Sequence, residues 1–233
     1  MSDLIRDEQH GDVALLTMDD GKANALSHAM IDALDAGLDR AEADASALVL
    51  AGREGRFSAG FDLSVMQAGP EAARALVAAG GRLCARLYTL PVPVVVACTG
   101  HALAGGALLV LSGDHRVGAA GDFKIGLNEV AIGLPLPQFA IDLAEQRLSR
   151  RHVTRATVLA HIYPPDEAVD AGYLDSVVAD PVPEALDVAT ELTARLSSFG
   201  FAGSRRTARQ AVADKIVSEL EADLAHFGLD PDA

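Results

Sequence analysis

The sequence predicts an α/β fold, in which parallel strands alternate with helices that cover the sheet. Two short apolar runs, ALVLAG (47–52) and PVVVA (93–97), contain β-branched residues and border glycine or proline, which is typical of buried strands. Segments with apolar residues at helical spacing lie before and between these runs. A strand, a helix and a second strand in this order require a crossover connection, and crossovers produce parallel sheets.

The chain is expected to begin with a hairpin and a long helix. Apolar and polar residues alternate through Val13, Leu15 and Thr17, and Gly11-Asp12 supplies a turn. Ser27 suits the N-cap of the helix that follows. The inward stripe of this helix is expected at Ile31, Leu34, Leu38 and Ala41.

The middle of the chain continues the alternation of strands and helices. A helix is expected over about 71–89, and a shorter helix, GGALLVLSG (105–113), follows the strand at 93–97 almost at once. HRVGA (115–119) and DFKI (122–125) are expected to form further short strands.

The last third of the chain changes to mainly helical patterns. Pro164-Pro165 and YLDSVVADPVP (173–183) are expected to interrupt them. The expected helices cover 137–148, 150–161, 184–197 and 204–226. Their apolar faces suit an oligomer contact or burial against the same domain.

Composition limits the function classes. The formal net charge of −14 argues against general affinity for nucleic acid or for an anionic membrane surface. An anionic ligand would need local cations, for which Lys22, Arg53 and Arg56 are the candidates. The start of the chain is acidic where a secretion signal is basic and then apolar, so we expect a cytoplasmic protein. Cys84 and Cys98 lack a metal-type partner pattern and are expected to be buried thiols.

Two glycine-bearing turns follow predicted strands. RFSAGFDL (56–63) comes after the strand at 47–52, and GHALAGGALLVL (100–111) comes after the strand at 93–97. Open α/β sheets place ligands at the carboxyl ends of their strands, and free N–H groups at a helix start can stabilise an oxyanion. Taken separately, each turn also suits an ordinary loop or tight helix packing.

A carboxylate lies in a third segment, FKIGLNEVAIGLPLP (123–137), which is mostly apolar. Burial of Glu129 without a cation would raise its pKa, as a general base that must return its proton requires. A helix-start or water-facing carboxylate is the alternative for this segment alone.

In order and spacing, these three segments resemble the crotonase (enoyl-CoA hydratase/isomerase) superfamily. PPDEAVDAGYLDSVV (164–178) resembles the family's link to its C-terminal helices, and KANALS (22–27) resembles its coenzyme A-binding stretch. The resemblance covers roughly residues 5–180. It implies a ββα spiral core over 1–195, a helical trimerisation region over 196–233, and a homotrimer or a dimer of trimers. It also implies an acyl-CoA thioester substrate and no cofactor beyond the coenzyme A of that substrate.

The resemblance assigns roles to individual residues. It implies that the main-chain N–H groups of Ala59 and Gly105 hold the thioester oxygen and that Glu129 moves protons. Asp62 and Asp114 match family positions for which we expect structural roles. The residues implied to line the path of the substrate and coenzyme A are Lys22, Ala23, Ala25, Ser58, Gly60, Phe61, Asp62 and Leu108.

The identity of one position favours a particular reaction. Hydratases of this family use two glutamates, and Leu108 occupies the first of those positions here. With Glu129 alone and the IGLNE segment, the chain resembles Δ3,Δ2-enoyl-CoA isomerases of fatty acid metabolism. A hydratase or another crotonase-type reaction with an unrecognised water-holding group, and an inactive acyl-CoA binder, are the alternatives.

Other polar residues are expected to have structural roles. His101 is expected to be hydrogen-bonded structure, and His152 and His161 lack partners at metal-ligand spacing, so no metal site is predicted. Asp142 and Glu145 are expected on a solvated helix face. The family's usual C-terminal cation near coenzyme A is not recognisable, and Arg205, Arg206 and Lys215 are candidates for that charge.

Overall fold

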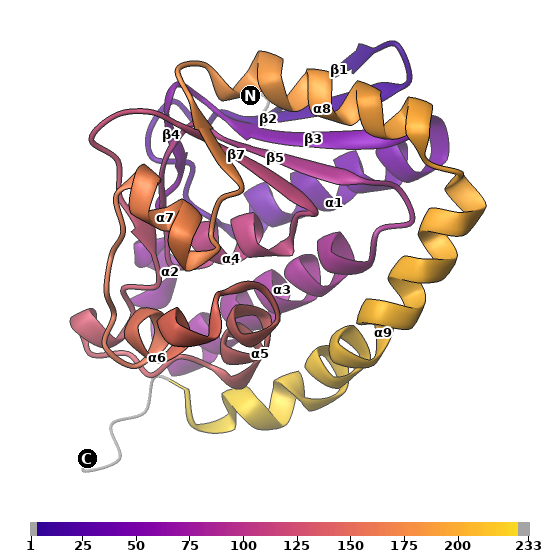
Figure 1. The fold of residues 1–233 in the computed structure, drawn as a ribbon. Helices are drawn as coiled ribbons and strands as arrows, with labels where there is room; N and C mark the ends of the chain where they lie inside the picture. Colours follow the sequence, from indigo (N-terminus) through magenta and orange to yellow (C-terminus); the bar gives the residue numbers. More distant parts are fainter. Residues whose placement is uncertain (1–3, 228–233) are drawn as a thin grey trace.

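A computed structural model describes residues 4–227 and shows one large sheet covered by helices on both faces (Figure 1). The sheet has the strand order β1-β2-β3-β5-β7-β9, and every neighbouring pair except β1–β2 is parallel. These strands are β1 (Ile5–His10), β2 (Val13–Met18), β3 (Ala47–Gly52), β5 (Val94–Cys98), β7 (His115–Ala119) and β9 (Ser176–Val178). The predicted α/β class, hairpin and central strands are therefore confirmed.

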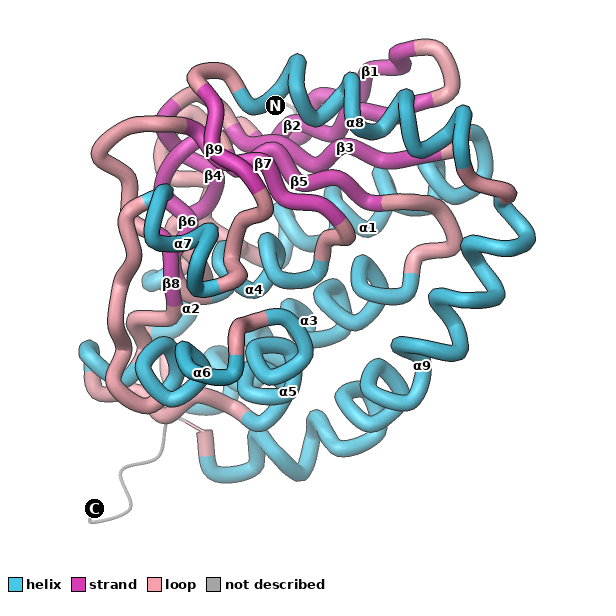
Figure 2. Tube along the Cα trace, viewed as in Figure 1, coloured by secondary structure: helices cyan, strands magenta, loops and turns pink. Residues whose placement is uncertain are grey.

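The central strands are buried on both faces, which explains their nearly continuous apolar sequences. On one face of the sheet lie α1 (His28–Asp44), α3 (Pro70–Thr89) and α4 (Gly105–Ser112); α8 (Pro181–Arg195) covers the other face (Figure 2). Ser27 caps α1, because its side chain accepts a hydrogen bond from the Met30 N–H at 3.2 Å. The predicted helix at 71–89 and the predicted cap are thus confirmed.

A second, three-stranded sheet was not predicted. It consists of β4 (Gly55–Ser58), β6 (Gly100–Leu103) and β8 (Ile125–Gly126), all parallel. A Cβ on Gly100 would lie 2.1 Å from the Gly55 carbonyl carbon, so the two strands require glycine at this contact. This small sheet brings together three segments that the sequence analysis singled out separately, 56–63, 100–111 and 123–137.

The C-terminal helices depart from the expected bounds. They are α5 (Gln138–Arg147), α6 (Arg150–Thr157), α7 (Pro165–Ala171), α8 and α9 (Ser198–Asp223). The expected interruption at Pro164-Pro165 is confirmed, because residues 158–164 are not helical. Helix α7 was not predicted, and Pro165 begins it, because proline at the first helical position needs no N–H partner. Helix α9 leaves the sheet and packs along α3 and α5 (Figure 1).

Buried charges fasten α9 to the sheet. Asp114, which precedes β7, accepts from Arg205 at 2.9 Å and from Arg209 at 3.0 Å. The structural role predicted for Asp114 is confirmed. Arg205 is only 5 % exposed, so its candidacy as a cation for coenzyme A is wrong.

Lys215 and Asp142 also differ from expectation. Lys215 pairs with Asp142 at 2.9 Å. Asp142 is buried, so its expected place on a solvated face is wrong, whereas Glu145 is exposed as expected. The pair joins α5 to α9.

Cys84 and Cys98 are buried free thiols, as predicted. Across residues 4–227 no helix combines the length and the apolar character needed to cross a membrane.

Candidate active site

A cavity of about 390 Å³ opens where the small sheet meets α3 and α5. Its lining is mostly apolar and includes the alanines Ala23, Ala25, Ala59 and Ala104. Glu129 is the only ionisable side chain among the described residues that line it. A concave apolar site with few polar groups is the usual form of a small-molecule site.

Glu129 follows β8 and precedes the 3-10 turn η1 (Val130–Ile132). Its side chain is 7 % exposed, and burial raises its pKa from 4.5 to about 7. Its Oε2 atom is buried and finds no hydrogen-bond partner within residues 4–227. The carboxyl group can therefore gain or lose a proton near neutral pH, as the sequence analysis expected of a general base.

The N–H of Ala59, expected to hold the thioester oxygen, is already engaged. It donates to the Ala23 carbonyl at 3.0 Å, and the next N–H, of Gly60, donates to Ser58 Oγ at 3.2 Å. The Asp62 N–H donates to the Leu26 carbonyl at 3.1 Å. The assignment of Ala59 as the amide donor is therefore wrong, although its side chain does line the cavity.

Within residues 59–62, Phe61 carries the amide that remains. Its N–H meets no acceptor in the part of the chain that the structure describes, and the residue lines the cavity. The resemblance implied for Phe61 only a place on the substrate path. Which amide is free depends on hydrogen bonds to residues 23 and 26, more than thirty positions away, so local sequence could not reveal it.

Gly105 lies directly beside Phe61. It is the first residue of α4, so its N–H has no intrahelical partner. A Cβ on Gly60 would lie 3.2 Å from the Gly105 nitrogen, and a Cβ on Gly105 would lie 3.1 Å from the Phe61 ring. Gly60 has φ +93°, a conformation that glycine adopts readily. The amides of Phe61 and Gly105 are thus held close together at the edge of the cavity.

Leu108 lines the cavity from α4, as the resemblance implied. Its side chain is 1 % exposed and belongs to the main apolar core. A side chain without donors, acceptors or charge cannot orient a water molecule.

The other predicted site residues divide into two groups. Ala23 and Ala25 line the cavity, whereas Lys22, Ser58 and Asp62 do not. The Lys22 carbonyl accepts from Arg53 Nε at 2.9 Å, and the Ser58 hydroxyl donates to the Asn24 carbonyl at 2.7 Å. Asp62 caps the short helix α2 (Leu63–Met66) by accepting from the Ser64 N–H at 2.8 Å, as its predicted structural role requires.

Asn128 and Phe227 are among the lining residues of the cavity that were not predicted from the sequence as site residues. The Oδ1 atom of Asn128 is buried and has no partner among the described groups. Asn128 could have been predicted as a site residue, because it is the sequence neighbour of Glu129. Phe227 could not have been predicted in this way, because it lies almost one hundred positions beyond Glu129 in the sequence.

His101, near the glycine turn, has the structural role that was expected. Its Nδ1 accepts from the Lys124 N–H at 3.0 Å. That bond links β6 to the segment before β8.

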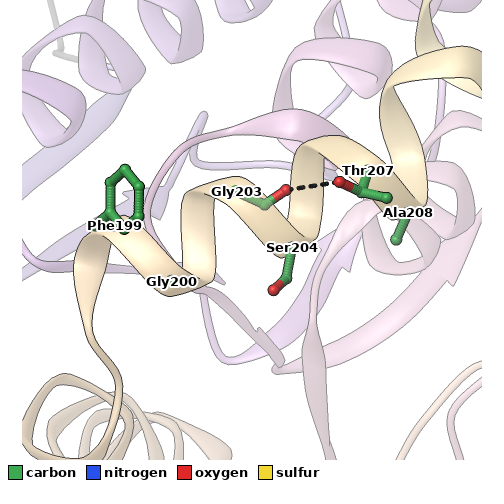
Figure 3. Close-up of a pocket in the computed structure, with 6 residues that line it drawn as sticks. All are labelled: Phe199, Gly200, Gly203, Ser204, Thr207 and Ala208. Atoms are coloured by element: carbon green, nitrogen blue, oxygen red, sulfur yellow. Dashed lines mark hydrogen bonds between the residues drawn. The ribbon is translucent and has the colours of Figure 1, made fainter.

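A second hollow, of about 490 Å³, lies on the surface of α9 (Figure 3). Phe199 projects from the helix at one end of it, and the Thr207 hydroxyl donates to the Gly203 carbonyl at 3.1 Å. Its lining residues include no titratable side chain. The cavity at Glu129 is therefore the better candidate for chemistry.

Both the sequence and the fold are similar to those of known proteins. The family described as enoyl-CoA hydratase/isomerase matches residues 8–228. Human mitochondrial enoyl-CoA delta isomerase 1 is 30% identical over 96% of this chain and 76% of its own. A probable enoyl-CoA hydratase of Bacillus subtilis is 34% identical over 79% of this chain and 72% of its own.

The fold is shared with a solved structure. A crystal structure of an enoyl-CoA hydratase/isomerase family protein from Pseudomonas syringae superposes with a TM-score of 0.93 and 39% identity, covering 97% of this chain and 98% of the other. The chain belongs to the enoyl-CoA hydratase/isomerase family.

Proposed function

We propose that this enzyme converts a 3-enoyl-CoA into the conjugated 2-enoyl-CoA. The observation that carries the proposal is a lone buried carboxylate, that of Glu129, whose pKa is raised to about 7 in a cavity where Leu108 stands in place of a second acid. One base that takes and returns a proton suffices for moving a double bond. Adding water to a double bond also requires a group that orients the water.

The proposed reaction has two proton transfers. Glu129 removes a proton from the α carbon, and the electron pair of the broken C–H bond moves toward the carbonyl group to form a dienolate with its negative charge on the thioester oxygen. The N–H groups of Phe61 and Gly105 donate to that oxygen. Glu129 then delivers the proton to the γ carbon, the double bond settles between the α and β carbons, and the carboxylate is regenerated.

The two backbone amides are suited to stabilise the negative charge that develops on the thioester oxygen. Both donors belong to the backbone and are fixed by β4, β6 and the start of α4, so they need little rearrangement as charge develops. Removal of a single such donor costs about two to three orders of magnitude in rate in acyl-transfer enzymes.

Replacing Glu129 with glutamine tests the proposal. Glu129→Gln should reduce the rate of 3-enoyl-CoA isomerisation by about two to four orders of magnitude, because a positioned base contributes that much. Binding of a saturated acyl-CoA should change little, since glutamine keeps the shape of the side chain. Glu145→Gln, an exposed change on α5, is the matched control and should behave as the unaltered protein.

Product analysis separates the rival reactions. Incubation with a 2-enoyl-CoA in water should yield little 3-hydroxyacyl-CoA. Faster formation of that product than of the isomer would assign the chain to the hydratases. Acyl-CoA binding without turnover of any unsaturated thioester would show a binding protein instead.

A further inference from the structure

The cavity has an exposed side and a buried end. Leu63 and Ile132, which border the cavity, are 63% and 56% exposed. Val77, Phe139 and Phe227 border it too, and none is more than 6% exposed. Substrate must enter from the exposed side, so an acyl chain that extends inward ends against this buried apolar group.

Phe227 differs from the rest of that group in how it is held. Val77 lies within α3 and Phe139 within α5, whereas Phe227 follows the 3-10 turn η2 (Leu224–His226) at the end of α9. Its N–H donates to the Leu224 carbonyl at 3.0 Å. Of these three residues, Phe227 is the one that follows a short turn and does not lie in a regular helix or strand.

The end of α9 is nevertheless fixed in place. A Cβ on Gly81 of α3 would lie 3.0 Å from Leu220 and 3.4 Å from the Phe139 ring, so α9 meets α3 directly beside the other aromatic wall. Leu220 and Leu224 are both buried in the same core as Phe227. This packing fixes the end of α9, and with it the place of Phe227 on the cavity wall.

We propose that Phe227 is the stop at the inner end of the acyl cavity and limits this enzyme to short- and medium-chain enoyl thioesters. The inference rests on the proposed isomerase function for its choice of substrate. If a methylene takes about the volume of a water molecule, ~30 Å³, the cavity of about 390 Å³ has room for roughly a dozen such groups. The thioester and the nearest pantetheine methylenes take about four of these places, which leaves roughly eight for the acyl chain.

Affinities for saturated acyl-CoA thioesters test the stop independently of turnover. In a calorimetric series from six to sixteen carbons, affinity should rise about fourfold with each buried methylene and level off near eight carbons. We call the chain length at which affinity stops rising the levelling point. In Phe227→Ala the levelling point should shift to chains that are longer by roughly three methylenes, because the phenyl ring vacates about that much space. Phe227→Leu should move it less. Phe199→Ala removes a phenylalanine that is 91% exposed on α9, and it should leave the levelling point unchanged.

Turnover gives a second readout. The ratio of kcat/KM for twelve-carbon over six-carbon 3-enoyl-CoA should rise about tenfold or more in Phe227→Ala, within the range by which apolar pockets discriminate chain length. The six-carbon rate and the circular dichroism spectrum report whether the variant folds; if it does not, Phe227→Leu supplies the comparison. A levelling point that is the same with and without the ring overturns the proposal, as does affinity that rises steadily to sixteen carbons. A shift in binding without any isomerisation would reject the proposed function while leaving the stop intact.

Discussion

Glu129 is a carboxylate whose surroundings disfavour its charge. Burial raises the pKa, and the side chains beside it in the cavity include Leu134 and Ile132, which offer no compensation. A base whose pKa lies near the working pH can both accept and return a proton. This property follows from desolvation, and it agrees with the expectation drawn from the apolar run around the residue.

The raised pKa makes the activity sensitive to pH in a defined direction. The base must be ionised, so kcat/KM for a short 3-enoyl-CoA should fall about tenfold per pH unit below the pKa of about 7 and level off above it. Initial rates between about pH 5 and pH 9 measure this profile. An acid limb near pH 4.5, the ordinary value for glutamate, would show that Glu129 is not buried in the active enzyme.

Side-chain chemistry was easier to predict at this scale than backbone chemistry. Glu129 stands out in the sequence because it is a lone acid in an apolar segment. The free amide does not stand out, because Ala59 and Phe61 each have an N–H and only their partners differ. The Ala23 carbonyl takes one of them, and that contact exists only in the folded chain.

At the scale of elements, long periodic segments were predicted well and short strands poorly. Helix α3 begins and ends within one residue of its expected range. Strands β4 and β6 have four residues each and include His101 and Arg56, so neither has the apolar pattern of a buried strand. Their pairing nevertheless positions both amides, so the small sheet matters more for the site than its length suggests.

The attachment of α9 depends on a compact group of charges. Burial lowers the pKa of Arg205 to about 10, so its guanidinium remains charged at neutral pH beside Asp114. Asp114 also accepts from the Val94 N–H at 2.7 Å, which links the same carboxylate to β5. Arg205 donates to the Tyr88 carbonyl at 3.1 Å, so α9 is tied to the end of α3 as well.

Removing Asp114 should therefore loosen α9. Asp114→Ala leaves Arg205 and Arg209 largely buried without their counter-ion, and the free energy of unfolding should fall by about 3–5 kcal/mol. Denaturant unfolding monitored by circular dichroism measures the loss. Glu191→Ala, which removes an exposed pair with Arg195 at 3.7 Å, is the control and should cost no more than about 0.5 kcal/mol. Equal stability of the two variants would contradict a fastening role for Asp114.

For the whole molecule, the order of strands and helices could be predicted because each buried strand and amphipathic helix carries its own periodicity. The cavity could be predicted only in part, because its walls come from segments as distant as Ala23 and Phe227. Its acid and several of its alanines lie in recognisable stretches. Its inner wall depends on where α9 ends in space, which no local pattern encodes.

Burial of Glu129 also has a cost for the fold that can be measured. Below pH 4.5 the carboxyl is protonated in both the folded and the unfolded chain; between pH 4.5 and about 7 only the unfolded chain loses its proton. Rising pH therefore favours unfolding across this window, by roughly 3–4 kcal/mol in total for this group. Glutamine cannot ionise, so the stability of Glu129→Gln relative to the unaltered protein should increase across the window and stay constant above it.

Urea unfolding at a series of pH values and a fixed protein concentration isolates this effect. The difference in the free energy of unfolding between Glu129→Gln and the unaltered protein cancels the contributions of groups that titrate alike in both. The exposed change Glu145→Gln should give no comparable trend, since its carboxyl loses little hydration on folding. A difference that does not vary with pH would mean that the carboxyl of Glu129 is hydrated in the folded chain. The same low-dielectric surroundings that disfavour its charge are what the proposed base requires, so stability and catalysis should change over the same pH range.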